Sequence, residues 1–498
     1  MKNLSPILRA LCLMMVLCLT VGCVAVVSAE EEPLQVTMYL GCLVLEYPPD
    51  GNEIEKTIED YIGGVDFKIN AYSQSVLHEM MPTLIAGGDL PMVVNVGGSQ
   101  LSKSYMITAM KSGEFWDVTD YLNTLENFKD LNPACISNYA IGGRNYGLPL
   151  ERGISREATT YRYDWLQNLG MEDPTTVEEL VTMLKRFTTD DPDGNGIDDT
   201  YGTVNDPTGR LAIMLGAPLN WRYEDGHMLK AELTEEYTQA LDISRELYAI
   251  GAIHPEYTIR ERADIEGDLI QGKAGAYFNT STDITAFQSL MVQPEAVLHA
   301  SNIFANEDGN IYTAAGRGNN GALLFSTKAI PDKETLDKVI NIFDRLADQE
   351  MCNLLALGVE GKNYEVVNGV AHMLPDEDGS IKNFYTNSIY NPYTVPMAVR
   401  WPNLRTIPAE LDYGAKRNLE IIEENAPYAV ADPTLGLTSE LYLELGPDLD
   451  TLLGDAKVLY IMGQIDRDEY LKRVEQWRAQ GGDDIAADYA RLYEEKNG

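Results

Sequence analysis

Apolar residues alternate between two periods along the first part of the chain. Residues 34–40 and 65–71 show the period of two that predicts half-buried strands, whereas residues 53–62 and 75–86 repeat apolar side chains at helical spacing. A third strand is predicted near residues 93–96. Regular alternation of strand and helix predicts an α/β fold with parallel strands and helices on both faces of the sheet. Ligands of such sheets bind beyond the carboxyl ends of the strands.

Amphipathic helices continue through the middle of the chain. Residues 175–187 carry an apolar stripe, and either Thr175 with Glu178 or Thr176 with Glu179 can form a capping box at its start. Residues 234–250 form a second predicted helix. A short apolar strand at 321–326 is followed by a helix predicted over 333–347. The length of 498 residues exceeds what one hydrophobic core supports, so two lobes are expected.

The N-terminal segment predicts export. Lys2 and Arg9 precede an apolar run over residues 10–21, which is typical of a signal peptide. Cleavage after Ala29 would produce a soluble secreted chain, and a lipobox reading would instead make Cys23 the lipidated first residue. A retained membrane anchor is a third interpretation, because the apolar character continues to residue 29.

Composition limits the classes of partner. The chain has 77 Asp and Glu residues against 38 Lys and Arg residues, a formal net charge of −39. Such a surface repels nucleic acid and anionic lipid. It also disfavours a polyanionic ligand unless calcium or a local basic patch offsets the field. Beyond the export segment only Cys42, Cys135 and Cys352 remain, which predicts buried thiols and at most one disulfide.

An acidic loop over residues 191–200 has the spacing of a calcium site. Its oxygen donors fall at loop positions 1, 3, 5, 7 and 9, where position 7 offers a backbone carbonyl. The predicted ligands are Asp191, Asp193, Asn195, Ile197 and Asp199. Position 12, which is a Glu in an EF-hand, is Gly202. The alternatives are a solvated acidic turn and a calcium ion that bridges an acidic ligand, but we expect a structural site.

Several motifs occur in an order that resembles one known family. They are G-G-D-L-P at 87–91, Y-G-L-P at 146–149, R-Y-D-W-L-Q-N-L-G at 162–170, T-V-E-E-L at 176–180, D-P-D-G-N-G-I-D-D at 191–199, G-K-A-G-A at 272–276 and I-M-G at 461–463 before Y-L-K-R-V-E-Q-W at 470–477. This series resembles the extracellular solute-binding proteins of ABC importers, family 1, in the lipoprotein branch that serves oligosaccharides.

The resemblance implies a two-lobed fold of the periplasmic-binding-protein type, type II, with parallel-sheet lobes joined by a hinge. The boundaries it implies are residues 1–29 for export and 30–149 for lobe 1, to which residues 320–350 return. Lobe 2 would span residues 150–319, contain the calcium loop and be completed by residues 351–498.

The sequence favours binding over catalysis. No H-E-x-x-H, G-x-S-x-G or G-x-x-x-x-G-K-[ST] motif occurs in the sequence, and no two of the five histidines are four residues apart. A pair of carboxylates for glycoside hydrolysis remains an alternative among so many acidic residues.

Aromatic and polar residues in loops are the candidate ligand contacts. Sugar rings stack on Trp and Tyr side chains, and their hydroxyls pair with amides and guanidinium groups. The chain has 28 Tyr and 5 Trp but only 10 Phe residues. The candidates are Trp221, Trp401, Tyr277, Phe278, Arg317 and Asn319. For each of them, packing in a core or a turn is the alternative.

These observations predict an exported, monomeric solute-binding protein. It would enclose an oligosaccharide between its lobes and deliver it to the permease subunits of an ABC transporter. It would act at the extracellular face of the cell membrane, held by a lipid anchor, or in the periplasm. The alternatives are a secreted carbohydrate-active hydrolase, a peptide-binding member of the same family, and a calcium-stabilised adhesion protein.

Overall fold

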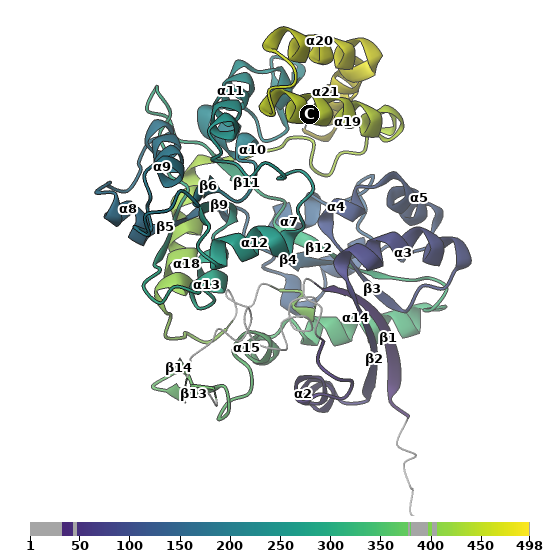
Figure 1. Cartoon of the computed structure of the whole chain (residues 1–498). Helices are drawn as coiled ribbons and strands as arrows, with labels where there is room; N and C mark the ends of the chain where they lie inside the picture. Colours follow the sequence, from purple (N-terminus) through teal and green to yellow (C-terminus); the bar gives the residue numbers. More distant parts are fainter. Residues whose placement is uncertain (1–31, 43–46, 377–378, 380–396, 401–405, 498) are drawn as a thin grey trace, which may run out of the picture.

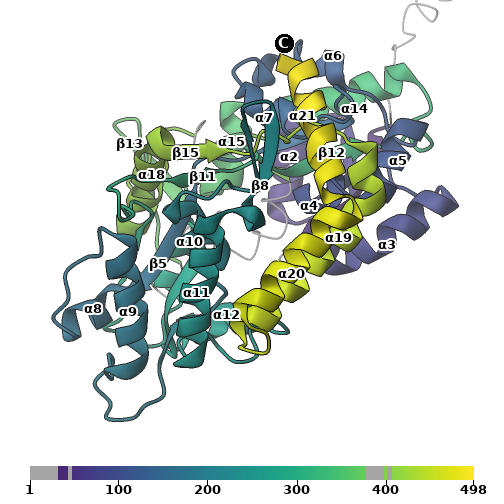
Figure 2. The same cartoon turned by 90° about the horizontal axis from the view of Figure 1, so that it is seen from above.

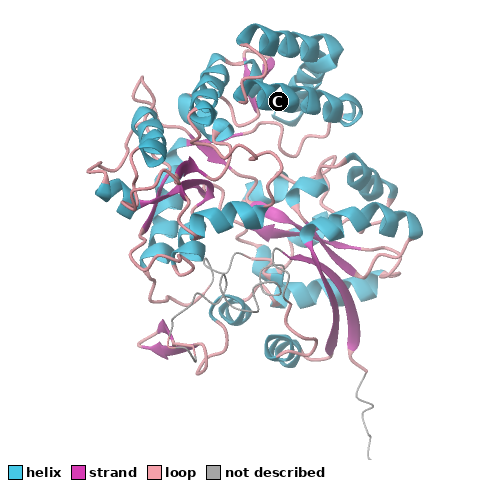
Figure 3. Cartoon of the chain, in the orientation of Figure 1, coloured by secondary structure: helices cyan, strands magenta, loops and turns pink. Residues whose placement is uncertain are grey.

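A computed structural model describes residues 32–42, 47–376, 379, 397–400 and 406–497. Two mixed α/β lobes lie side by side, and the C-terminal helices pack beside the second lobe (Figure 1). Strands form the centre of each lobe, and helices surround them (Figure 3).

Lobe 1 is built on a five-stranded sheet with the order β2-β1-β3-β12-β4. Its strands are β1 (Leu34–Cys42), β2 (Val65–Ser73), β3 (Val93–Val96), β4 (Gly147–Glu151) and β12 (Asn319–Phe325). β1 runs parallel to β2 and β3, as the alternating pattern predicts. β12 returns from far along the chain and pairs antiparallel with both β3 and β4.

Helices cover both faces of this sheet. The helices of lobe 1 are α2 (Glu53–Ile62), α3 (Gln74–Gly87), α4 (Gly98–Leu101), α5 (Ser104–Ser112), α6 (Thr119–Leu122), α7 (Pro133–Ser137), α14 (Lys333–Arg345) and α15 (Gln349–Leu357). Ile54 of α2 and Leu336 of α14 are buried in one core, whereas Leu77 of α3 and Met106 of α5 are buried in the core of the other face. Each predicted amphipathic stripe therefore faces the sheet.

Lobe 2 has a four-stranded sheet with the order β10-β5-β9-β6. The strands are β5 (Glu157–Arg162), β6 (Tyr201–Thr203), β9 (Ala274–Thr280) and β10 (Leu298–Ser301). Its helices are α8 (Tyr163–Asn168), α9 (Val177–Thr189), α10 (Thr208–Leu215), α11 (Glu235–Ala249), α12 (Arg262–Ile270), α13 (Asp283–Gln288) and α18 (Tyr413–Asn425). The predicted capping box begins α9, because Thr176 and Glu179 bond each other's backbone.

The chain ends in three helices that share the core of lobe 2. They are α19 (Glu440–Ile461), α20 (Arg467–Trp477) and α21 (Asp483–Asn497), and Figure 2 shows them from above. Leu453, Tyr470 and Trp477 pack in the same core as Leu241 of α11. The start of α19 also contacts lobe 1, where Ser104 Oγ donates to Leu443 O at 3.3 Å.

One lobe boundary differs from the prediction. The sequence analysis assigns residues from 351 onward to lobe 2, but Met351, Leu354 and Leu355 of α15 are buried in the lobe 1 core beside α14. Val399 lies in that same core. The boundary at 351 is therefore too early, because the apolar face of α15 covers the sheet of lobe 1 before the chain enters lobe 2 at α18.

Judged from the described residues, the chain passes between the lobes three times. It crosses between β4 and β5, between β11 (Thr313–Ala315) and β12, and again between Val399 and α18. β11 pairs with β15 (Ala429–Ala431) next to these crossings. The fully buried Asn425, at the end of α18, donates from Nδ2 to Ser155 O at 2.9 Å and to Glu157 O at 2.8 Å. Thr313 Oγ1 donates to the Asn425 carbonyl at 3.0 Å, so this residue joins two crossings.

Short hairpins complete the fold. They are β7 (Trp221–Glu224) with β8 (His227–Lys230), and β13 (Tyr364–Val367) with β14 (Val370–Met373). Cys42, Cys135 and Cys352 are buried, which confirms the prediction of buried thiols. Over the part of the chain that the structure describes, no helix has both the length and the apolarity to cross a membrane.

Candidate functional site

Two adjoining cavities lie where the lobes and the C-terminal segment meet. The larger has a volume of about 440 Å³ and the smaller about 250 Å³. Asn220, Arg317, Asp432 and Leu435 line both cavities, so the two form one continuous cleft. The larger volume alone is in the range of small-ligand pockets, about 300–1,000 Å³.

All three parts of the structure contribute to the larger cavity. Lobe 1 supplies Ser102 and Asn138, lobe 2 supplies Trp221 and Lys230, and α19 supplies Tyr442. The smaller cavity is lined by the crossing between β4 and β5, with Arg152 and Arg156, and by the crossing between β11 and β12, with Arg317 and Asn319. A molecule in this cleft would therefore touch both lobes and the segments between them.

Trp221 supports the wall of the larger cavity. Its side chain is 5% exposed, and its ring lies 5.6 Å from that of Tyr489 and 6.2 Å from that of Trp477. Lys230 Nζ, across the β7–β8 hairpin, lies 5.2 Å from the ring centre. The hairpin therefore brings an indole to the cleft, but most of its surface packs inside lobe 2.

Arg317 and Asn319 occupy the crossing between β11 and β12. Gly318 between them has φ +77°, and a Cβ there would lie 3.3 Å from Cys135 Cα, so the chain passes close to α7. Arg317 Nη1 donates to Ser102 Oγ at 3.0 Å, and Asn319 Nδ2 donates to Cys135 O at 3.1 Å. Burial lowers the pKa of Arg317, and the charge of Asp432 acts against that shift.

Asp432 is a cleft residue that the sequence analysis missed. Its carboxylate accepts hydrogen bonds from Asn220 Nδ2 at 2.9 Å, from Thr434 Oγ1 at 2.7 Å and from Thr434 N at 2.9 Å. Tyr442 and Tyr489 were also missed, because they lie on helices whose aromatic residues suggest packing alone. Only the tertiary arrangement brings these side chains to the crossings.

The other aromatic candidates do not line the cleft. Tyr277 packs against Phe287, with ring centres 6.1 Å apart, and is 7% exposed. Phe278 is 4% exposed and belongs to the core on the opposite face of β9. Neither residue lines either of the two cavities. Trp401 lies outside the described residues.

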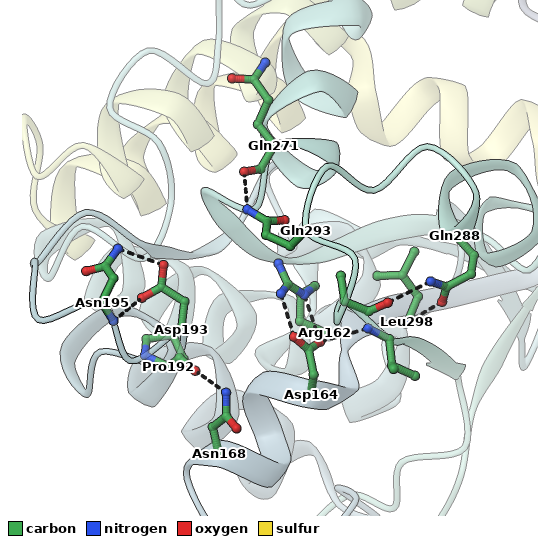
Figure 4. A network of polar contacts seen from close by, with 12 residues as sticks. Arg162, Asp164, Asn168, Pro192, Asp193, Asn195, Gln271, Gln288, Gln293 and Leu298 are labelled. Carbon is green, nitrogen blue, oxygen red and sulfur yellow. Dashed lines mark hydrogen bonds and ion pairs between the residues drawn. The ribbon is translucent and has the colours of Figure 1, made fainter.

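The acidic loop folds around Asn195. Asn195 Nδ2 donates to Asp193 Oδ2 at 2.9 Å and to Asp199 Oδ1 at 3.3 Å, while Asn195 N donates to Asp191 Oδ1 at 3.1 Å. Ile197 N donates to Asn195 Oδ1 at 2.7 Å. Figure 4 shows the Asp193–Asn195 contact together with the bond from Asn168 Nδ2 to Pro192 O, which is 3.0 Å long and ties the loop to α8.

This donor set fits a hard cation. Three carboxylates lie within hydrogen-bonding reach of one residue, and carboxylate oxygens are the ligands calcium prefers. Loss of solvent, together with the nearby carboxylates of Asp191 and Asp199, raises the pKa of Asp193, whose neutral form a cation would disfavour. Among the residues that the structure describes, no group of three acidic, His or Cys side chains is already arranged around a common metal position. The loop is closed by Asn195 instead.

Position 12 of this loop cannot supply the missing ligand. Gly202 lies in β6, and a Cβ there would lie 2.6 Å from Leu184 O. The close packing of β6 on α9 thus excludes the Glu of an EF-hand, and the loop differs from an EF-hand for a steric reason.

The comparisons with known proteins agree on the architecture. No family model matches the chain. The alginate-binding protein AlgQ2, solved without calcium ion, superposes with a TM-score of 0.69 at 17% identity over 93% of this chain and 98% of its own. An EF-hand mutant of the Streptococcus pneumoniae ABC-transporter substrate-binding protein FusA, in complex with fructo-nystose, gives 0.67 at 18% identity over 94% and 99%. The chain has the fold of an extracellular solute-binding protein.

Two curated proteins of Bacillus subtilis are similar to this chain over most of its length. Lipoprotein LipO is 27% identical over 461 residues, which cover 90% of each chain. The polygalacturonan/rhamnogalacturonan-binding protein YtcQ is 26% identical over 467 residues, which cover 92% of this chain and 91% of its own. The predicted family resemblance and the two-lobed fold are thereby confirmed.

Proposed function

We propose that this protein captures an oligosaccharide between its lobes outside the cytoplasm and delivers it to an ABC importer. The observation that carries the proposal is the cleft of two adjoining cavities, which both lobes and the crossing segments line. The relatives support the class of ligand, since two are named for binding polygalacturonan/rhamnogalacturonan and alginate, and a third is in complex with fructo-nystose. Because those names differ, they leave the sugar open.

Ligand binding would close the lobes. Trp221 presents an aromatic edge, while Arg317, Asn319 and Asp432 present donors and acceptors to hydroxyl groups. A ligand that contacts both lobes only in the closed form shifts the equilibrium from the open to the closed form. The size of the shift is set by the difference in its affinity for the two forms. The buried Asn425 contacts would keep the crossing segments together while the lobes move.

The carboxylates of the larger cavity favour binding over hydrolysis. Glu232 and Asp450 lie 3.4 and 3.6 Å from Lys230 Nζ, and Tyr442 Oη donates to Asp450 at 2.7 Å. Carboxylates already engaged by a lysine or a tyrosine hydroxyl of the protein are less available to act on a glycosidic bond. We therefore propose a binding protein, and a hydrolase is the competing function.

We also propose that the acidic loop binds calcium as a structural ion. Asp191, Asp193 and Asp199 would supply carboxylate oxygens, Asn195 its amide oxygen and Ile197 its backbone carbonyl. Two relatives support this, since one is described without calcium ion and another as an EF-hand mutant. The ion would fix the connection between α9 and β6, far in sequence from the cleft residues.

Export completes the proposal. The N-terminal signal and the similarity to Lipoprotein LipO support lipidation of Cys23 and attachment to the outer face of the membrane. The partners would be the permease subunits of an ABC transporter, and the protein would act as a monomer.

The proposal is tested with the chain from residue 30, titrated by calorimetry and thermal unfolding with oligosaccharides and peptides. We expect a glycan to raise the unfolding midpoint with concentration and to be recovered unchanged. Cleavage of the glycan would support the hydrolase instead. Stabilisation by peptides alone would contradict an oligosaccharide ligand.

A further inference from the structure

The charge of the smaller cavity differs in sign from that of the protein. The whole chain carries a formal charge of −39. The cavity lining nevertheless includes three arginines, Arg152, Arg156 and Arg317, against two carboxylates, Glu157 and Asp432. In a strongly acidic protein, such a local excess of cations needs a specific reason.

The two carboxylates of that cavity are already engaged. Glu157 forms an ion pair with Arg210, whose Nη2 also donates to Asn279 O at 3.1 Å. Burial and the nearby charge of Arg156 lower the pKa of Arg210 to about 10. The carboxylate of Asp432 accepts its three hydrogen bonds from neutral donors, not from an arginine. Among the described residues, neither of these two carboxylates forms an ion pair with Arg317.

Arg317 is the cation most open to a ligand. It lines both cavities, and within the described residues its guanidinium donates only to the neutral hydroxyl of Ser102, at 3.0 Å. Across the described residues, no carboxylate lies within ion-pair distance of it. A half-buried guanidinium normally obtains a carboxylate or phosphate partner, because desolvation of its charge is costly. The lowered pKa of Arg317 reflects that cost.

Its place in the chain suits ligand recognition. Arg317 lies on the crossing between β11 and β12, while Arg152 and Arg156 lie on the crossing between β4 and β5. The three arginines therefore lie on segments that connect the lobes, where a hinge motion would change positions least. A guanidinium fork at this point can hold a planar carboxylate in both the open and the closed form.

We infer that the cleft takes an acidic oligosaccharide and that Arg317 binds the carboxylate of one of its uronic acid residues. This inference rests on the proposed function and adds the chemical class of the sugar. A neutral oligosaccharide, whose hydroxyls would pair with Arg317 and Asp432 alike, is the competing ligand.

The test compares charged sugars with matched neutral ones. The wild-type chain from residue 30, with calcium present, is titrated by calorimetry with trisaccharides of galacturonate, mannuronate, guluronate and glucuronate. Each is paired with its carboxyl-reduced form, which keeps the linkage and removes the charge. We expect at least one acidic trisaccharide to bind, and its reduced form to bind about 10- to 100-fold more weakly, as expected for loss of a charge-assisted pair.

Variants assign the effect to Arg317. Arg317→Gln should weaken the acidic sugar about tenfold or more and its reduced form by a clearly smaller factor, while Arg317→Lys should restore part of the loss. Arg491→Gln is the matched control, because Arg491 is 54% exposed on α21, bonds only Asp488 and Glu495 of its own helix, and lines neither cavity. Unchanged unfolding midpoints of the unliganded variants would show that each is folded.

The outcomes separate this inference from the proposed function. If a neutral trisaccharide binds as tightly as its acidic form, or if Arg317→Gln weakens both equally, the acidic ligand is refuted and the oligosaccharide-binding function stands. An equal loss in Arg491→Gln would also refute it, because overall charge would then be the cause. If no glycan, acidic or neutral, binds the wild-type chain, both proposals fail.

Discussion

Asn425 should be among the most sensitive positions between the lobes. Its side chain is fully buried, and Nδ2 makes two hydrogen bonds to backbone carbonyls of the first crossing, 2.9 and 2.8 Å long. A hydrogen bond contributes about 0.5–1.5 kcal/mol net, so Asn425→Ala should lose about 1–3 kcal/mol from these two bonds. The space left by the amide adds to that cost, and we expect a free energy of unfolding about 2 kcal/mol or more below wild type.

Urea unfolding followed by tryptophan fluorescence measures this loss. Asn497→Ala is the control, since Asn497 Nδ2 donates to Tyr493 O at 2.9 Å on the exposed end of α21. Water can replace that bond, so the control should change stability by less than about 0.5 kcal/mol. If Asn425→Ala unfolds within about 0.5 kcal/mol of wild type, then the buried amide does not hold the crossings together and our account of the hinge is wrong.

Three further predictions concern the loop, its neighbour and a buried acid. Chelation should lower the unfolding midpoint, calcium should restore it, and Asp193→Asn should reduce both effects; a midpoint indifferent to chelator would leave an ordinary acidic turn. Gly202→Glu should destabilise the protein instead of completing the loop, because the added Cβ would lie 2.6 Å from Leu184 O. Its calcium affinity should not exceed that of wild type, and a higher affinity would show that the new carboxylate does reach the ion. Burial raises the pKa of the folded-state Glu55 carboxyl from 4.5 to about 7. Protonation of this carboxyl therefore stabilises the folded state fully below pH about 4.5, and that stabilisation is lost as the pH rises through about 7. The free energy of unfolding of Glu55→Gln should therefore rise relative to wild type between pH 5 and pH 8, by about 1–3 kcal/mol at most. A difference between variant and wild type that does not change with pH would contradict the raised pKa.

Local patterns predicted much of the fold. The capping box of Thr176 and Glu179 begins α9 as expected, because its two hydrogen bonds depend only on residues three apart. The apolar stripe over residues 333–347 corresponds to α14, Lys333–Arg345. The direction of β12 could not be predicted from its own residues, since a short apolar strand pairs equally well in either direction and long-range topology decides.

The site was harder to predict than the fold. The candidates Arg317 and Asn319, which a Gly-rich turn carries, do line the cleft. Asp432 was not found, because its neighbours in sequence give no sign that it faces Arg317 in a shared cavity. Tyr277 and Phe278 point to opposite faces of β9. Because each face is covered by a hydrophobic core, both side chains are buried in a core and neither reaches the cleft.

Three crossings of the chain leave the two lobes few ways to move. Twisting one lobe against the other would work against the segments between β4 and β5 and between β11 and β12 at once. A hinge motion that bends both segments together would strain them less. Occupancy of the cleft would then be expressed as one angle, so a pair of fluorescent labels, one on α3 and one on α9, would make this protein a ratiometric sensor for its own ligand.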